Sequence, residues 1–176
     1  MNKYTIIFIS TLFITQLFSQ ITDGCDLPGG MLYLSEDNNS SVLYNSPAHC
    51  SYCDDEIYNN NTQDWVNQME SCENNGNTWI IDYQMTDAAE CSAVPSITGA
   101  GGWWFTGDIG GFQFNVEGAT ANSASGGDAG ANGMFMQTMG DMVLGFFLSG
   151  GFIPAGCGTL VELNLSGEAT GLINLV

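Results

Sequence analysis

The stretch Gly111–Val116, which reads GFQFNV, alternates between apolar and polar side chains. Successive side chains of a β-strand point to opposite faces, so the two phenylalanines and the valine would face a core while glutamine and asparagine face solvent. Glycine recurs too densely in the surrounding sequence for stable helices. The stretch therefore predicts a half-buried β-strand.

Other short apolar runs lie on either side of it, spaced at roughly 8–12 residues and separated by glycine- and serine-rich turns. They are Trp103–Thr106, Met134–Thr138, Met142–Leu148, Thr159–Leu165 and Leu172–Val176. Met142–Leu148 is apolar at almost every position, which predicts a strand buried on both faces. We expect an all-β fold, a jelly-roll-like antiparallel β-sandwich, over the glycine-rich region 99–176.

The preceding region, residues 21–98, is rich in cysteine and asparagine and predicts one short helix. Trp65, Met69 and Cys72 recur at helical spacing, and Asp64 would lie in the first turn. Short strands are expected at Met31–Leu34, Ser41–Tyr44 and Trp79–Met85, and the inner face of the last would hold Trp79, Ile81, Tyr83 and Met85.

The charge of the chain is one-sided: its 176 residues include 19 aspartates and glutamates but a single lysine or arginine, Lys3. Residues 1–20 combine this positive start with an apolar run and the small Ser19, which predicts a secretory signal peptide and a secreted or cell-surface protein. Without them no lysine or arginine remains. Nucleic acid and an anionic membrane surface are therefore excluded as partners, because both bind basic side chains.

Six cysteines in an exported chain predict three disulfides. Spacing alone does not select among the possible connectivities. We expect Cys25 to pair with Cys157, which leaves Cys50, Cys53, Cys72 and Cys91 to pair within the first region. Such bonds would compensate for the lack of ion pairs by restricting the unfolded chain.

A family resemblance rests on Ile109–Val116, Ala124–Asp128, Val143–Phe146, Ile153–Leu165 and the closing stretch Gly167–Leu172. The order of strands and glycine turns over residues 102–176 resembles a cohesin-type module. Related modules resemble family 3 carbohydrate-binding domains and share their jelly-roll sandwich. The resemblance implies a non-catalytic extracellular module for protein interaction or scaffolding.

The family pattern leaves the sheet incomplete at Val176, and three arrangements are open. Residues 21–98 supply the first strands of the sandwich or form an insertion. Alternatively, the chain is truncated at its C-terminus, or a strand from a neighbouring molecule fills an open edge.

The motif His49–Cys53, which reads HCSYC, allows a redox-active Cys-x-x-Cys pair and thus a thiol-disulfide oxidoreductase. The carboxylates that follow at residues 54–56 would raise a thiol pKa rather than lower it. A zinc site from His49, Cys50, Cys53 and Cys72 is a further alternative. Two ordinary disulfide cysteines are the favoured interpretation.

Two groups of side chains are candidates for ligand binding. Asp54, Asp55, Glu56 and Asp64 lie among asparagines and offer the oxygen ligands that Ca²⁺ requires, although a solvated acidic loop is the favoured interpretation. Trp103 and Trp104 would point to opposite faces of a strand, and we expect Trp104 to be the exposed one.

No pattern of catalytic residues is apparent, so the predicted function is binding rather than turnover. We expect a non-catalytic module with a protein partner, or alternatively a carbohydrate-binding module that stacks aromatic rings on a polysaccharide. No cofactor other than Ca²⁺ is expected.

Overall fold

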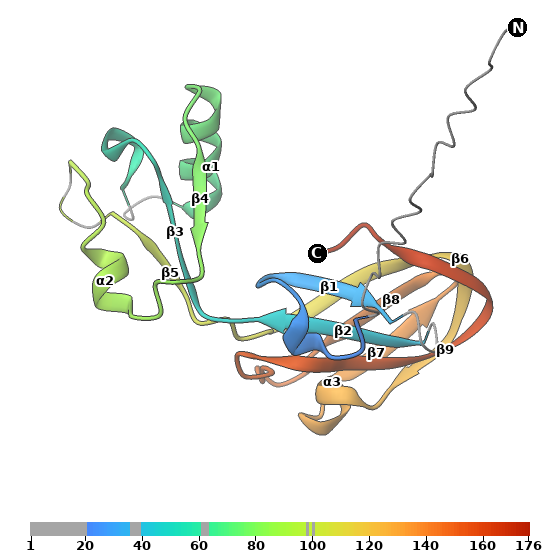
Figure 1. Ribbon diagram of the computed structural model, residues 1–176. Helices are drawn as coiled ribbons and strands as arrows, with labels where there is room; N and C mark the ends of the chain where they lie inside the picture. The colour runs from blue at the N-terminus through green and yellow to red at the C-terminus, as the bar shows by residue number, and fades with distance from the viewer. Residues whose placement is uncertain (1–20, 36–39, 61–63, 98, 100) are drawn as a thin grey trace, which may run out of the picture.

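The computed structural model describes residues 21–35, 40–60, 64–97, 99 and 101–176 (Figure 1). The predicted signal peptide, residues 1–20, lies outside the described residues. The described chain is mostly β, with two antiparallel sheets and a few short helices. This confirms the all-β prediction.

The strands are β1 (Met31–Leu34), β2 (Ser41–Ser46), β3 (His49–Cys53), β4 (Trp79–Asp82), β5 (Trp103–Phe105), β6 (Gly111–Ser125), β7 (Phe135–Met139), β8 (Met142–Phe146) and β9 (Gly156–Ile173). The helices are α1 (Trp65–Asn74), α2 (Ala88–Ser92) and α3 (Gly127–Ala131), with 3-10 turns η1 (Gly24–Asp26) and η2 (Glu56–Tyr58). α1 confirms the predicted helix. α2 and α3 were not expected, because helices of 5 residues show too little periodicity to be recognised.

The larger sheet has six strands in the order β1-β2-β9-β6-β8-β7, and each neighbouring pair is antiparallel. β6 and β9 are its long central strands. β9 pairs with β2 along its first part and with β6 along the rest, so the expected break between Leu165 and Leu172 does not occur.

β6 keeps one face toward the core by means of a bulge. The strand buries even-numbered residues up to Val116 and then an odd-numbered one, Ala121. The register with β9 shifts between these residues at Gly118, which has a φ of 81°. A Cβ at this position would lie 2.5 Å from the carbonyl oxygen of Glu168, so only glycine fits. The extra residue bends the strand and restores the inward face.

The curved sheet surrounds one hydrophobic core to which both of its ends contribute. Val42 of β2, Phe114 of β6 and Val143 of β8 are all fully buried there. α3 adds Ala129, which is also fully buried. The six-stranded sheet thus folds over itself and needs no second sheet to cover this core.

The prediction that Met142–Leu148 is buried on both faces is wrong. β8 buries only Val143 and Gly145, whereas its alternate residues are half-buried and Leu148 lies exposed beyond the strand. Only one face of β8 looks toward the core, because the core lies inside a single curved sheet.

Both sheets draw strands from either side of residue 98. β1 and β2 belong to the six-stranded sheet, while β3, β4 and β5 form a three-stranded sheet in the order β4-β3-β5. Figure 1 shows this smaller sheet, with α1 and α2, standing away from the larger one. The first region therefore supplies two strands of the larger sheet, and an inserted unit (residues 49–105) lies between β2 and β6.

The chain enters and leaves the inserted unit through two adjacent segments. The Ser46 hydroxyl donates a hydrogen bond of 2.8 Å to the carbonyl oxygen of Gly107. Gly107 has a φ of 82°, and a Cβ there would lie 2.6 Å from the carbonyl oxygen of Ser46. The two segments thus pack backbone against backbone.

The predicted inner face of Trp79–Met85 is also wrong. β4 ends at Asp82, whose carboxylate accepts the N–H of Gln84 at 2.8 Å and turns the chain. Ile81 is 52% exposed on this edge strand. Met85 packs instead against the small core beside Cys50 and Cys91.

The contact between Tyr44 and Asp128 predicts that the protein loses stability at alkaline pH. The buried Tyr44 hydroxyl donates a hydrogen bond of 2.9 Å to Asp128 Oδ2. Burial, and then the hydrogen bond to and charge of this carboxylate, raise the pKa of Tyr44 to about 12. Since the unfolded value is about 10, the stabilisation by the neutral phenol is complete below that pH and is lost as pH rises through the folded pKa.

Replacing Tyr44 by phenylalanine should therefore lower stability at neutral pH by roughly 1.5–3 kcal/mol. The variant should also lose less stability than the parent protein when the pH rises from about 9 to about 12. Thermal unfolding followed by circular dichroism across this range tests both effects. An identical alkaline loss in the two proteins would contradict this role of Tyr44.

Candidate functional site

β3 is the central strand of the three-stranded sheet and carries the Cys-x-x-Cys motif. Side chains three positions apart on a strand face opposite sides, so Cys50 and Cys53 project from opposite faces. Cys53 is bonded to Cys72 of α1, and Cys50 is bonded to Cys91 of α2. One disulfide thus attaches one helix to each face of the sheet.

This arrangement overturns the two reactive interpretations of the motif. Cys50 and Cys53 are almost completely buried and bonded to different partners, so they do not form the vicinal pair of a redox site. All six cysteines form disulfides, and none is available as a thiolate for zinc. The favoured interpretation, ordinary disulfide cysteines, agrees with the structure.

The third disulfide joins Cys25 to Cys157, the pairing expected from the sequence. It connects the turn before β1 to the start of β9. Three disulfides indicate an oxidising, extracellular environment. Among the described helices, none combines the length and the apolar character that a membrane span requires.

Asn59 organises the interior of the inserted unit. Its side chain accepts the N–H of Cys53 at 2.7 Å and donates to the carbonyl oxygens of Cys53 and Pro95 at 2.9 and 3.0 Å. Gln68 of α1 donates to Asn59 Oδ1 at 3.5 Å and accepts the indole N–H of Trp103 at 2.7 Å. This chain of hydrogen bonds connects α1, β3 and β5. The sequence did not point to it, because Asn59 lies in a run of asparagines that is typical of a solvated loop.

Replacing Asn59 by alanine should destabilise the protein by about 2–3 kcal/mol, because buried peptide groups of Cys53 lose their partners. Equilibrium unfolding in urea measures the effect. Asn74→Ala, at an exposed position of α1, is the matched control and should change stability by less than about 0.5 kcal/mol. Equal effects of the two substitutions would contradict the role of Asn59.

Three of the four calcium candidates lie together. Asp54, Asp55 and Glu56 line an open pocket of about 570 Å³, whose wall also includes Asn59 and Asn77. Asp64 is not part of this lining; its carboxylate accepts the N–H of Val66 at 3.0 Å and caps α1. The structure thus separates Asp64 from the other candidates.

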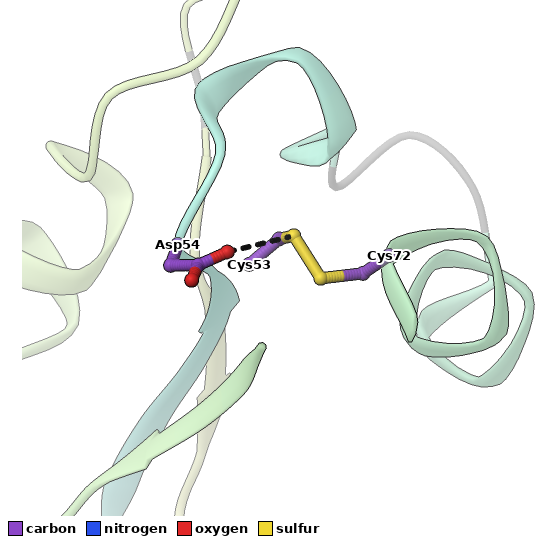
Figure 2. A group of neighbouring side chains, drawn as sticks. All are labelled: Cys53, Asp54 and Cys72. Carbon is purple, nitrogen blue, oxygen red and sulfur yellow. Dashed lines mark hydrogen bonds between the residues drawn. A yellow bond between two sulfur atoms is a disulfide. The ribbon is translucent and has the colours of Figure 1, made fainter. Parts of the chain in front are cut away.

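The carboxylates in the pocket also have structural roles. Asp55 accepts the N–H of Ile57 at 3.0 Å and caps η2. Asp54 Oδ1 accepts the N–H of Thr78 at 3.0 Å and lies 3.9 Å from Cys53 Sγ (Figure 2). Cys53, Asp54 and Cys72 lie close enough to share an ion, but both sulfurs belong to one disulfide and neither is a thiolate. Calcium binding by the acidic pocket stays a prediction.

The two tryptophans of β5 point to opposite faces, as expected, but neither is a free platform. Trp103 is hydrogen-bonded to Gln68 on the α1 side. Trp104, which we expected to be exposed, is half-buried against Cys50, Cys91 and Val94. The expectation for Trp104 is wrong because the short helix α2, which the sequence did not reveal, holds the disulfide and loop that cover this face.

A cluster of rings, here called the aromatic cluster (His49, Trp65, Tyr83 and Phe105), lies on the α1 face. His49 stacks on Phe105 with ring centres 4.9 Å apart, and Tyr83 contacts His49 at 5.0 Å. Trp65 meets Phe105 edge-on at 5.6 Å and remains 38% exposed. Sequence reasoning missed this cluster because it depends on the pairing of β3 with β5, which places His49 opposite Phe105.

Tyr83 also connects the inserted unit to the larger sheet. A Cβ on Gly30, which precedes β1, would lie 2.1 Å from the Tyr83 hydroxyl oxygen. Burial raises the pKa of Tyr83. The tyrosine therefore packs on the backbone of the turn that leads into β1.

Comparison with protein-family models, with curated proteins and with solved structures finds no match for this chain.

Proposed function

We propose that the protein is a secreted or cell-surface, non-catalytic cohesin-like module for protein interaction or extracellular scaffolding. The observation that carries the proposal is the inserted unit, which has its own small core and one disulfide on each face of its sheet. A rigid projection of this kind suits a binding surface, because little conformational freedom is lost on association. The curvature of the six-stranded sheet around one core supports the jelly-roll-like arrangement that the family resemblance implies.

Charge constrains the kind of partner. The chain has a formal net charge of −18, and its only lysine or arginine lies in residues 1–20. An acidic partner would be repelled, whereas a basic protein surface would be attracted over several ångströms. We therefore expect association with a basic partner, weakened by salt.

Affinity capture from the surface fraction of the source organism tests the proposal. The bait is the oxidised protein without residues 1–20, and the matched control is the same protein with all disulfides reduced and alkylated. We expect specific proteins on the oxidised bait alone, and their direct binding should weaken as ionic strength rises. Failure to retain any protein at low salt would contradict the proposal.

The aromatic cluster favours a second candidate function, binding of a polysaccharide. Trp65 is partly exposed and supported edge-on by Phe105, a geometry that would hold an aromatic face against a sugar ring. Affinity electrophoresis on soluble glycans tests this candidate. Trp65→Ala should abolish retardation, whereas Phe152→Ala, which removes an exposed aromatic outside the cluster, should not. No retardation on any glycan, or none lost in Trp65→Ala, would exclude carbohydrate binding here.

A further inference from the structure

β7 is the last strand of the six-stranded sheet, and among the described residues its outer edge pairs with no other strand. It forms a tight hairpin with β8, in which Met139 lies opposite Met142 across the loop Gly140-Asp141. Gly140 has a φ of 66°, as a two-residue hairpin loop requires. The opposite edge strand, β1, instead shares a groove with residues 169–172 of β9.

The hydrogen bonds of β6 determine which backbone groups of β7 point outward. Gln113 exchanges two backbone hydrogen bonds of 3.0 Å with Val176, on the side away from β8. Its neighbour on β8, Leu144, therefore directs its own N–H and C=O toward Gln137 on β7. Because these directions alternate along a strand, the two residues that flank Gln137 direct their N–H and C=O groups out of the sheet.

The edge of β7 lacks the features that usually prevent pairing. Its sequence, FMQTM, contains no charged residue and no proline, and its register with β8 has no bulge. Phe135 is 45% exposed and Met139 is 69% exposed. Such an edge is a template for another β-strand.

We propose that two copies of the protein associate by antiparallel pairing of their β7 strands about a two-fold axis at Gln137. Phe135 of each copy then lies opposite Met139 of the other, which gives two sulfur–aromatic contacts. Met136 of each copy lies opposite Thr138 of the other, and these residues exchange the outward backbone hydrogen bonds. The result is one continuous sheet across both copies.

A second copy fits this edge because β7 carries no charged residue and its exposed side chains, Phe135 and Met139, lie symmetrically about Gln137. Each chain has a formal net charge of −18, so contact between identical acidic surfaces is unfavourable. The β7 pairing brings only uncharged side chains together. The nearest acidic residue of the hairpin, Asp141, lies in the loop beyond the strand, where the chain turns back toward β8. An isologous contact of this kind closes with two chains.

Sedimentation velocity of the oxidised protein without residues 1–20 tests the proposal, and we expect a concentration-dependent dimer. Gln137→Glu places two carboxylates opposite each other on the axis and should raise the dimer Kd by about tenfold or more. Gln113→Glu adds the same charge to an inner strand, β6, and should leave the Kd unchanged. Mixing Gln137→Glu with Gln137→Lys chains should restore dimers, because the axis then pairs opposite charges.

Hydrogen exchange tests whether the outer edge of β7 forms the dimer contact. The amides of Met136 and Thr138 should be protected in the dimer and should exchange rapidly in Gln137→Glu. A monomer at all concentrations, equal effects of Gln137→Glu and Gln113→Glu, or unprotected amides at 136 and 138 in the dimer would each overturn the proposal. Self-association requires only the chain itself, so a monomer would leave the proposed binding of a basic partner intact.

Discussion

Removal of the Cys25–Cys157 disulfide by the double substitution Cys25→Ala and Cys157→Ala should lower the free energy of unfolding by about 5 kcal/mol. The bond closes a loop with a sequence separation of 132 residues, so it restricts nearly the whole described chain when that chain unfolds. Cys25 is exposed and Cys157 is half-buried, so the substitutions leave no large cavity. Unfolding in guanidinium chloride, followed by tryptophan fluorescence, measures the loss.

A second double variant, Cys53→Ala with Cys72→Ala, is the comparison. This disulfide has a sequence separation of only 19 residues. Its loss should lower the free energy of unfolding by about 3 kcal/mol through the greater entropy of the unfolded chain. Loop closure therefore predicts a larger loss of stability for the Cys25–Cys157 variant than for the Cys53–Cys72 variant. A loss below about 1 kcal/mol for the Cys25–Cys157 variant would show that chain entropy does not govern its contribution.

Phe114→Ala should destabilise the protein by about 3–5 kcal/mol. The Phe114 side chain is 0% exposed at the centre of the core and stacks on Phe112 with ring centres 5.7 Å apart. The core cluster that contains it draws residues from strands across the whole sheet, which cannot all move inward to fill the space. Since a domain of this size has a total stability of roughly 5–15 kcal/mol, the variant would unfold at markedly lower urea concentration.

Phe152→Ala removes the same side chain from an exposed position and should change stability by less than about 0.5 kcal/mol. Equilibrium urea unfolding of both variants, with the m-value as a check on two-state behaviour, makes the comparison. A loss below about 1 kcal/mol in Phe114→Ala would contradict the single-core description of the six-stranded sheet.

Strands could be predicted where apolar and polar residues alternate strongly. They could not be predicted where a bulge changes which residues of the strand face the core. GFQFNV identified the start of β6, but the strand continues to Ser125 past Gly118. The bulge reverses the order of inward and outward residues, and the inward residues that follow are small alanines with little hydrophobic signal. The periodicity therefore seemed to end where the strand only bends.

The candidate site was less predictable because it depends on contacts between distant segments. Asp54, Asp55 and Glu56 are adjacent in sequence, so their common location in one pocket could be expected. Stacking of His49 on Phe105 requires the register of β3 with β5, which no local pattern encodes. The same applies to Asn59, whose burial is established only by its bonds to Cys53 and Pro95.

The alternation rule itself was sufficient to interpret the cysteine motif. A spacing of three places two side chains on opposite faces of any strand, and the structure places Cys50 and Cys53 in this way. Recognition of HCSYC as a strand would have excluded the vicinal pair from the sequence alone.

Because Ser46 and Gly107 lie next to each other, the inserted unit (residues 49–105) could be replaced by another segment. Excising them leaves every strand pairing of the larger sheet in place, removes the contact of Tyr83 with the turn before β1, and requires a short linker between the ends of β2 and β6. The same junction would accept a foreign loop or peptide as a graft. Diversification of such a scaffold can therefore proceed in the projecting part while the supporting part keeps its sequence.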